Sequence, residues 1–583
     1  MAKSIYIYSR EILPASVGQL LYEICRNMAP DNITPNDPRV VVHGNIAYGI
    51  MNPTNSLLES GTSLLMGQLF EKVENWGVPL QDFPDGSYAL FRNGDDYGEI
   101  VSDPVASRAI WYFQDEELFI ASTSQRAIVM FLGSFEFDER VIPWMLSTGT
   151  LGPSFTWDKR IRRVPADSSI ILNKIDWSVT IKSNPIILDP VERPDEQHEI
   201  QLREILKSSF KSINLDWSRW VLPLSGGYDS RGILCLLLDS DSNNRTLRTI
   251  TWGLKSSKNV EGNDASVAGN LANQLKVANI YYSNDLSEEP IEIVIDRFIL
   301  VGEGLIDNLS DYLDGFGMWK AVFESGIEGI VRGDEAFGWV PVSSSLAVRL
   351  NDTCCLCSDF SNLKDYRKYG FSLQELPRNL CKKEGETLST WRDRVFQVYS
   401  QSVIQSALSD LKLSYVEQIN PLLSKKILQQ VRQLPDHLRN DRLLFKKIVK
   451  SLSPEIDFST SASSTPPEEI LKRRHMVKLL ENELNSENAR RIFPGEFLDF
   501  VKKGIISRDQ PVPANGGSSQ VRSSFKKIIP QFVKDVIRSE IALPVIDSNL
   551  LAFRVFMISK MYQTLSKDSI MNKASTFQQI AEN

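Results

Sequence analysis

The chain has 583 residues, of which 42% are hydrophobic and 24% are charged, and its formal net charge is −8. This length exceeds what one hydrophobic core usually organises, and the composition is that of an ordinary globular protein, which excludes a disordered, fibrous or small disulfide-stabilised protein. The acidic balance disfavours nucleic acids and anionic membranes as partners, because both attract basic surfaces.

The sequence also predicts a compartment. Residues 1–8 alternate like a strand and lack the apolar core of a signal peptide, and no apolar run reaches the length that spans a membrane. We therefore expect a cytoplasmic protein that has no membrane partner and keeps its thiols reduced. The clustered cysteines at 354–357 have no neighbouring histidine that would complete a zinc site, so we predict no metal there.

Residues 1–185 contain short alternating runs, such as 87–91 and 117–121, that are separated by turn residues. This pattern predicts the strands of a layered domain with two sheets. Prolines and acids between 187 and 197 predict a linker, which places a domain boundary near residue 190.

From residue 218 the pattern changes to alternating strands and helices. The expected strands are 220–224, 247–252 and 277–282, and the expected helices are 230–238 and 264–275. This alternation is typical of a parallel sheet covered by helices and predicts an α/β domain. Beyond about residue 380 the pattern is mostly helical, with a Ser/Thr/Pro-rich interruption at 459–467 and a polar loop at 511–519.

The segment from Ser225 to Ser230 follows an apolar strand and reads Ser-Gly-Gly-Tyr-Asp-Ser. Gly226 and Gly227 allow backbone N–H groups to approach phosphate oxygens, and the next helix offers the positive end of its dipole. Asp229 would repel phosphate, but its carboxylate oxygens suit Mg²⁺. The segment therefore predicts binding of ATP together with Mg²⁺.

The alternative for this segment is a plain turn between a strand and a helix. Gly-Gly and Asp-Ser are common in turns and caps, and Pro223 suits a central strand poorly. The chain has no G-x-x-x-x-G-K-[ST] motif, so a loop that serves transfer of the terminal phosphate is not supported. Motifs further along the chain favour the nucleotide loop.

Several segments resemble, in the same order, those of the asparagine synthetase family. Residues 225–230 resemble its pyrophosphatase loop, and 251–253 resemble the strand that holds adenosine. Residues 333–338 resemble its Asp-Glu-Leu-Phe-Gly signature, and 420–423 and 441–444 resemble its C-terminal helical signals. Further segments between 76 and 165 resemble its glutaminase half, so the resemblance covers roughly residues 1–450.

The resemblance implies an α/β chain with three parts. Residues 1–190 would form an Ntn-glutaminase-like αββα sandwich that is degenerate. Residues 191–460 would form a parallel-sheet domain of the adenine-nucleotide α-hydrolase-like kind, the PP-loop ATP pyrophosphatase. Residues 461–583 would form a helical C-terminal extension.

The resemblance also implies roles for individual residues. A substrate carboxylate would attack the α-phosphorus of ATP, giving an acyl-adenylate and pyrophosphate, while Asp229 and Asp334 hold Mg²⁺. The implied catalytic residues are Asp229, Asp334, Glu335 and Lys446. The implied ATP-binding residues are Leu224, Ser225, Gly226, Gly227, Asp229, Ser230, Trp252, Gly253 and Gly333. The plainer alternatives are an acidic pair at a helix start for 334–335 and a solvated helix face for Lys446.

The position of the family's glutaminase nucleophile differs here. In the family a cysteine follows Met1 and its thiol attacks glutamine, whereas this chain has Ala2 there and its first cysteine is Cys25. A methyl group cannot act as a nucleophile, so we expect no glutaminase activity. The amine would then be free ammonia or an amino group of the substrate itself.

These features predict an ATP-dependent, AMP- and pyrophosphate-forming C–N ligase. Ring closure of a peptide or small molecule, as in β-lactam synthetases and lasso-peptide cyclases, is the leading interpretation. An ammonia-dependent amidating enzyme, transfer of the acyl group to another acceptor, and a nucleotide-binding scaffold without catalysis stay open. The scaffold is suggested by 457–467, which lacks the family's loop lysine, and by Val331, where the family has an acid or tyrosine. The expected partners are a small-molecule or peptide carboxylate, and a processing enzyme or a second copy of the chain.

Overall fold

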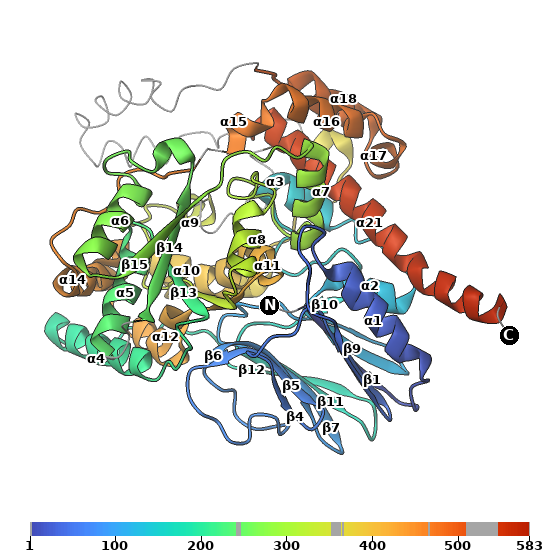
Figure 1. Cartoon of the computed structure of the whole chain (residues 1–583), viewed down its shortest axis with the longest axis horizontal. Helices are drawn as coiled ribbons and strands as arrows, with labels where there is room; N and C mark the ends of the chain where they lie inside the picture. Colours follow the sequence, from blue (N-terminus) through green and yellow to red (C-terminus); the bar gives the residue numbers. More distant parts are fainter. Residues whose placement is uncertain are drawn as a thin grey trace.

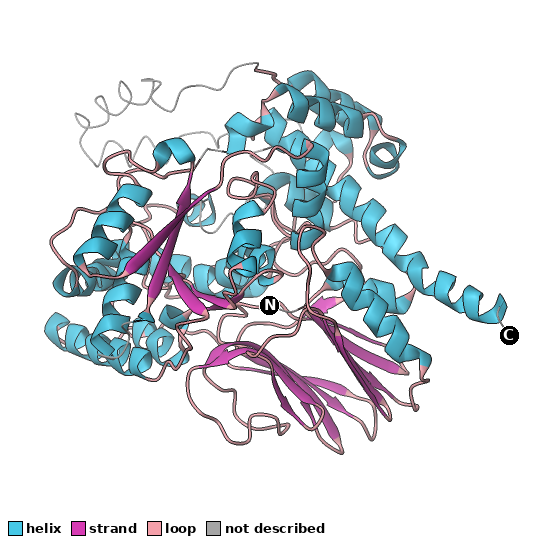
Figure 2. Cartoon of the chain, viewed as in Figure 1, coloured by secondary structure: helices cyan, strands magenta, loops and turns pink. Residues whose placement is uncertain are grey.

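The computed structural model describes residues 3–581 except 241–245, 351–362, 364–365, 373, 465–466 and 509–545. The described chain is a mixed α/β protein with two antiparallel sheets and one parallel sheet, as Figures 1 and 2 show. None of the described helices is long and apolar enough to cross a membrane.

The first part of the chain forms two six-stranded antiparallel sheets. In order across the first sheet the strands are β10 (Arg162–Arg163), β8 (Trp111–Gln114), β9 (Leu118–Ser122), β1 (Ser4–Ser9), β3 (Ile46–Ile50) and β2 (Arg39–His43). Across the second they are β12 (Val179–Ser183), β11 (Ser168–Asn173), β7 (Tyr97–Ser102), β6 (Gly86–Asn93), β5 (Ser63–Leu69) and β4 (Leu58–Ser60).

The two sheets pack face to face because alternate residues of each strand are large and apolar. Tyr6 of the first sheet stacks on Phe91 of the second with their ring centroids 5.5 Å apart, and the ring of its cross-strand neighbour Tyr48 lies at the same distance from Tyr6. All three rings belong to the core between the sheets. The predicted layered domain with two sheets is therefore present.

The outer faces of this sandwich differ from the implied αββα arrangement. Helices α1 (Ser16–Met28) and α2 (Gln125–Leu132) cover the first sheet. The second sheet is covered instead by the segment 70–85, whose Trp76 and Phe83 pack on Leu90, and this segment contains no helix. Its two prolines and a glycine interrupt helical hydrogen bonding, which explains the missing second helical layer.

The second part contains a five-stranded parallel sheet. Its order is β15 (Ala278–Ser283), β14 (Arg248–Gly253), β13 (Trp220–Pro223), β16 (Gly329–Val331) and β17 (Glu417–Ile419). The expected strands at 220–224, 247–252 and 277–282 are present within two residues of their predicted ends. Pro223 is the last residue of β13, where a missing N–H is tolerated.

Both faces of the parallel sheet are covered, since Val221 packs into one core cluster and its neighbour Leu222 into another. The helices of this part are α4 (Asp195–Lys211), α5 (Tyr228–Ser240), α6 (Asp264–Gln274), α7 (Ile291–Gly302), α8 (Gly317–Glu324), α9 (Ser345–Leu350), α10 (Leu388–Val395), the π-helical η5 (Phe396–Gln405), α11 (Ser406–Leu413), α12 (Lys425–Arg432), α13 (Asp436–Arg439) and α14 (Leu443–Leu452).

The remaining helices tie the two parts together. They are α3 (Val141–Thr148), α15 (Pro467–Leu471), α16 (Arg474–Leu484), α17 (Glu487–Ile492), α18 (Gly495–Gly504) and α21 (Ser548–Ala581). The long helix α21 packs on α2 and α3 as well as on α16 to α18, and Figure 1 shows it running past α2 to the C-terminus. One continuous core therefore joins the first sheet, the helices beside the parallel sheet and α21.

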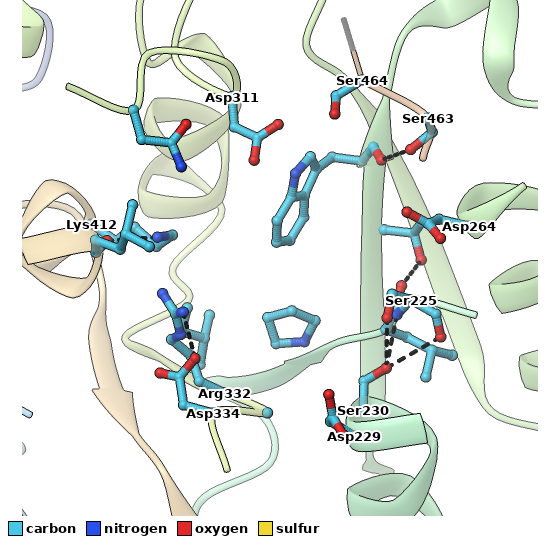
Figure 3. A pocket seen from close by; sticks show the side chains of 18 of the residues that line it. Ser225, Asp229, Ser230, Asp264, Asp311, Arg332, Asp334, Lys412, Ser463 and Ser464 are labelled. Atoms are coloured by element: carbon cyan, nitrogen blue, oxygen red, sulfur yellow. Dashed lines mark hydrogen bonds and ion pairs between the residues drawn. The ribbon is translucent and has the colours of Figure 1, made fainter. Parts of the chain in front are cut away.

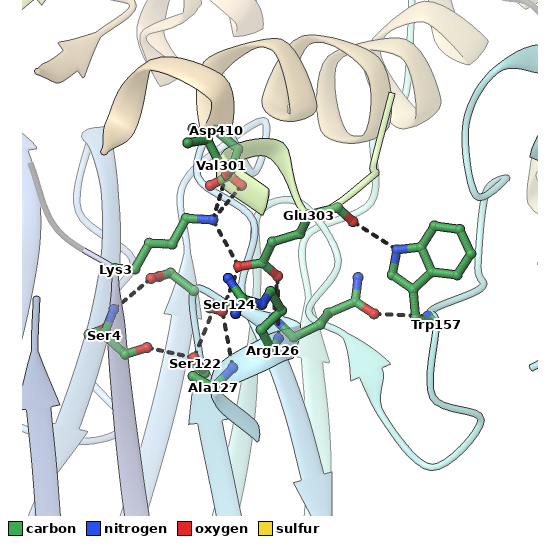
Figure 4. A network of polar contacts seen from close by, with 12 residues as sticks. Lys3, Ser4, Ser122, Ser124, Arg126, Ala127, Trp157, Val301, Glu303 and Asp410 are labelled. Carbon is green, nitrogen blue, oxygen red and sulfur yellow. Dashed lines mark hydrogen bonds and ion pairs between the residues drawn. The ribbon is translucent and has the colours of Figure 1, made fainter. Parts of the chain in front are cut away.

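A buried ion network joins β1 to the second part (Figure 4). The Lys3 ammonium lies 2.8 Å from Glu303 Oε1 and 3.0 Å from Asp410 Oδ2, and its side chain is 3% exposed. Glu303 also accepts hydrogen bonds from the Ser124 hydroxyl and the Gln125 backbone amide. The start of the N-terminal sheet is thus fixed to acids at the end of α7 and in α11.

Candidate nucleotide-binding site

The strand order of the parallel sheet predicts where a ligand binds. Counted along the chain the order is 3-2-1-4-5, so the connections diverge between β13 and β16. In such sheets ligands bind at the carboxyl ends of the strands where this divergence occurs. A cavity of about 370 Å³ lies there, and it is lined by Pro223, Leu224, Ser225, Asp229, Ser230, Thr251, Trp252, Asp264, Asn308, Asp311, Tyr312, Ile330, Arg332, Gly333, Asp334, Leu408, Lys412, Ser463 and Ser464.

The predicted phosphate loop is a compact turn between β13 and α5. The Ser225 amide donates to the Ser230 hydroxyl at 3.0 Å, and the Gly227 amide donates to the Ser225 hydroxyl at 3.3 Å. A side chain at Gly226 would place its Cβ 2.7 Å from two neighbouring side chains, so glycine is required there. The loop therefore presents its hydroxyls and the N-terminus of α5 to the cavity.

Asp229 is held by an arginine that the sequence analysis did not identify. Arg442 Nη1 lies 2.9 Å from Asp229 Oδ1 and 3.3 Å from Glu335 Oε1. Burial raises the pKa of Asp229, and burial together with the Asp229 charge raises the pKa of Glu335 to about 8. Two carboxylates thus share one guanidinium, and Glu335 faces this cluster without lining the cavity.

Asp334 lies on the opposite side of the cavity from the phosphate loop (Figure 3). Its carboxylate accepts a hydrogen bond from Arg332 Nη2 at 2.7 Å. Gly333 packs against Asp229 and Ser230, where an added Cβ would lie 3.3 Å from the Ser230 amide. The close approach of this glycine to the start of α5 sets the position of Asp334 across the cavity from Asp229.

Lys412 is a second cation on this wall (Figure 3), and the sequence analysis missed it. Its side chain comes from α11 and is 8% exposed, and its Nζ donates to the Leu408 carbonyl at 2.7 Å. Burial, and then the charge of Arg332, lower the pKa of Lys412 well below its usual value. A lysine four residues after Leu408, and so on the same helix face, is the signal that was available in the sequence, because apolar helix faces seldom carry one.

Acids outnumber cations around the cavity. Asp264 and Asp311 also line it, and burial raises the pKa of both. Such an arrangement is stabilised by a bound cation. Mg²⁺ that arrives with a nucleotide usually takes one or two protein carboxylates and completes its shell with phosphates and water. Asp229 and Asp334 fit that requirement, provided that Arg442 and Arg332 release or share them.

Several predicted residues lie near the cavity without lining it. They are Gly226, Gly227, Gly253, Glu335 and Lys446. Lys446 Nζ pairs with Asp441 at 2.8 Å and lies over the Tyr228 ring, 5.4 Å from its centroid. Leu224, Ser225, Asp229, Ser230, Trp252, Gly333 and Asp334 do line it.

The segment 457–464 lies against the phosphate loop. Phe458 stacks on Tyr228 with ring centroids 3.8 Å apart, and the Ser459 amide donates to the Gly226 carbonyl at 3.1 Å. Ser463 donates to the Trp252 carbonyl and lines the cavity with Ser464. This segment occupies the place where the resemblance implies a lysine-bearing loop, and its described residues offer hydroxyls instead.

The cysteines show no sign of metal chemistry in the part of the chain that the structure describes. Cys25 and Cys235 are buried, which raises the pKa of their thiols to about 12 and about 11. Cys381 is exposed, and the described residues include no cluster of three His, Cys, Asp or Glu that could hold a metal ion. The cysteines at 354–357 and Ala2 lie outside the described residues.

Comparison with known proteins adds little. No family model matches the chain, and no curated protein matches it. Among solved structures, glutamine phosphoribosylpyrophosphate amidotransferase from B. subtilis, complexed with ADP and GMP, is 12% identical, with 58% of this chain and 76% of that chain covered and a TM-score of 0.20. A structure of the allosteric regulatory enzyme of purine biosynthesis is also 12% identical, with 50% and 81% covered and a TM-score of 0.20. Likenesses of this size support no conclusion about activity.

Proposed function

We propose that the protein is an ATP-dependent ligase that activates a carboxylate as an acyl-adenylate and then forms an amide bond. The observation that carries this proposal is the cavity between β13 and β16, where the phosphate loop faces the cations Arg332 and Lys412. One wall suits the polyphosphate of ATP, and the other suits the phosphate group of an acyl-adenylate.

The proposed reaction has two steps. A substrate carboxylate oxygen attacks the α-phosphorus, the bond from that phosphorus to the bridging oxygen breaks, and pyrophosphate leaves. An amine then attacks the acyl carbon, AMP leaves, and the amine proton passes to solvent. Mg²⁺ bound by Asp229 and Asp334 would neutralise charge on the phosphate oxygens.

Lys412 is our candidate for the cation of the second step. The described residues of 457–464 contain no lysine, whereas Lys412 brings its amine to the same cavity from α11. Burial favours the neutral amine of Lys412 in the free protein, and the phosphate of a bound nucleotide or acyl-adenylate would favour the protonated form. Ligand binding would thus charge Lys412 where negative charge accumulates.

The amine would come from the substrate itself or from free ammonia, because Ala2 supplies no thiol for glutamine. Ring closure within one substrate molecule, a peptide or small molecule, is the form of the reaction that we favour. A nucleotide-binding scaffold without catalysis is the second candidate. It is favoured by Arg442 and Arg332, since both predicted metal ligands already have a guanidinium partner.

The nucleotide products test the proposal. We would incubate the protein with Mg²⁺, ATP and a panel of amino-bearing carboxylates, and separate the nucleotides by ion-exchange chromatography. Wild type should form AMP and pyrophosphate in equal amounts, and Asp229→Asn and Asp334→Asn should each abolish both products. Asp239→Asn, at the far end of α5 and half exposed, is the matched control and should retain activity.

Three results would contradict the proposal in different ways. Formation of ADP and phosphate would refute cleavage between the α and β phosphates. ATP binding measured by calorimetry, without pyrophosphate exchange for any carboxylate, would favour the scaffold. If the wild-type protein does not bind ATP, both the ligase and the nucleotide-binding scaffold are excluded.

A further inference from the structure

A second and larger cavity lies between the N-terminal sandwich and the segment 379–403, which includes α10 and part of η5. Its volume is about 550 Å³, and it contains no residue of the first cavity. Its lining includes four basic residues, and no Asp or Glu of the described chain lines it. In a protein with a net charge of −8 this is an unusual concentration of positive charge. The four basic residues are Arg162, Arg163, Lys383 and Arg394.

Arg163 is the central cation of this basic cavity. Its guanidinium lies over the Trp111 ring, 5.0 Å from the centroid, and Nη2 donates to the Ser406 hydroxyl at 2.7 Å. Its Nε is buried and has no hydrogen-bond partner among the described residues. Burial lowers the pKa of Arg163 to about 10, against the opposing effect of the Asp410 charge, and no described carboxylate forms an ion pair with the guanidinium. A stacked guanidinium with an unused donor is suited to an oxyanion.

Of the other three basic residues, one has a structural role and two are free of ion pairs with described residues. Arg394 is 2% exposed, and it pairs with Glu386 and donates to the Cys381 carbonyl at 2.6 Å. It thereby fixes the loop that carries Lys383. The side chains of Arg162 and Lys383 are exposed and form no ion pair with a described residue. Two exposed charges therefore line the cavity beside Arg163, which is partly buried.

The helical wall of the cavity has an unusual backbone. Val398, Tyr399, Ser402 and Val403 line it from η5, a π-helical stretch of ten residues. Long π-helical stretches are rare, and π-helical turns occur frequently at functional sites. The next helix, α11, begins with Ser406, which contacts Arg163, and ends near Lys412 in the first cavity.

We propose that the basic cavity binds a small metabolite that carries an oxyanion, a carboxylate or a phosphate, through Arg163, Arg162 and Lys383. The cavity is separate from the nucleotide site, and the inference does not rest on the proposed ligase activity. Arg163 supplies the desolvated contact, and the two rim residues attract the anion from solvent.

Protection of Lys383 from acylation tests this site directly. The full-length protein would be treated with an acetylating reagent, with and without citrate or inorganic phosphate, and Lys383 acetylation would be measured by mass spectrometry. The two anions separate carboxylate from phosphate recognition. Lys211, an exposed lysine at the end of α4, is the internal control and should react equally in every sample.

We expect at least one anion to protect Lys383 in wild type. Arg163→Gln should weaken the protection about tenfold, because it removes a charge-assisted contact. The exposed substitution Arg162→Gln should weaken it as well and cannot disturb the core, so the test remains valid if Arg163→Gln fails to fold. Arg491→Gln, an exposed arginine on α17, should change nothing. Equal acetylation of Lys383 with and without both anions would overturn the proposal, and so would protection that survives both cavity substitutions.

Discussion

Replacing Lys412 with methionine should stabilise the protein while impairing its chemistry. The Lys412 side chain is 8% exposed, and it forms no ion pair with a described carboxylate. Its Nζ has one hydrogen bond, to the Leu408 carbonyl, and lies 5.6 Å and 5.9 Å from the ring centroids of Tyr312 and Trp319. Methionine has a similar length and no charge, so Lys412→Met removes the cation and keeps the packing.

The magnitude follows from the protonation of Lys412. The unfolded chain holds this proton up to about pH 10.5, whereas the folded chain releases it at lower pH. Between these two values the unfolded state binds more protons, so the lysine reduces stability at neutral pH and the reduction fades as the pH rises to 10.5. Each unit of pKa corresponds to about 1.4 kcal/mol. We expect Lys412→Met to raise the free energy of unfolding at neutral pH by roughly 1–4 kcal/mol.

Urea unfolding followed by circular dichroism, at neutral pH and again near pH 10, measures this difference. The advantage of Lys412→Met should shrink at the higher pH, and its amide-forming activity should be lost at both. Lys446→Met is the control. Lys446 pairs with Asp441, so its charge should not destabilise the folded protein, and its replacement should not raise the free energy of unfolding. A less stable Lys412→Met at neutral pH, or an advantage that is independent of pH, would refute the reasoning.

Three further substitutions test other contacts. Burial raises the pKa of Glu335 to about 8, so the folded state binds more protons between pH 4.5 and 8 and stability falls across that range. Glu335→Gln should flatten the plot of melting temperature against pH. An unchanged slope would show that the pKa of Glu335 is not raised in the folded state. Arg108 pairs with Glu417 between the two parts of the chain and, against the effect of burial, holds the pKa of Glu417 down to about 2. Arg108→Met should lower the free energy of unfolding in urea by about 3–5 kcal/mol, and adding Glu417→Gln should recover part of this loss. An equal loss in the single and the double variant would argue against an interaction between Arg108 and Glu417. Gly226→Ala should weaken ATP binding in calorimetry more than tenfold, since its Cβ would lie 2.7 Å from neighbouring side chains; normal affinity would show that the loop does not hold ATP.

Local sequence patterns predicted the positions of helices and strands better than the way these elements pack together. The strands and helices between 220 and 282 were predictable because alternation of apolar segments is visible within a short window. The sheet order was not, since it depends on pairing between residues more than 100 positions apart, such as Trp220 with Gly329. The helical layer implied for the second sheet was wrong, because the prolines of 70–85 outweigh the resemblance.

The candidate site divides in the same way. The glycines and hydroxyls of the phosphate loop form a contiguous motif, and the structure brings Ser225 and Ser230 to one cavity with Asp334, whereas Gly226 and Gly227 do not line it. Lys412 reaches the site from α11 and belongs to no motif, and Arg442 lies in the segment 441–444, to which the resemblance assigned no role at Asp229. Lys446 was predicted near the phosphates, but it pairs with Asp441 beside a turn in which Asp441 and Arg442 have positive φ. That turn directs the arginine, and not the lysine, to Asp229.

The ion pairs of Lys3 affect whether the two parts of the chain can be produced separately. If the chain were cut near residue 190, the remaining part would lose Lys3 and Arg108, and Glu303, Asp410 and Glu417 would each lose a cation. Buried acids without partners are strongly destabilising. The two parts therefore form one cooperative folding unit, in which the N-terminal sandwich neutralises charges of its neighbour. The N-terminal sandwich therefore contributes to the stability of the second part independently of any glutaminase chemistry.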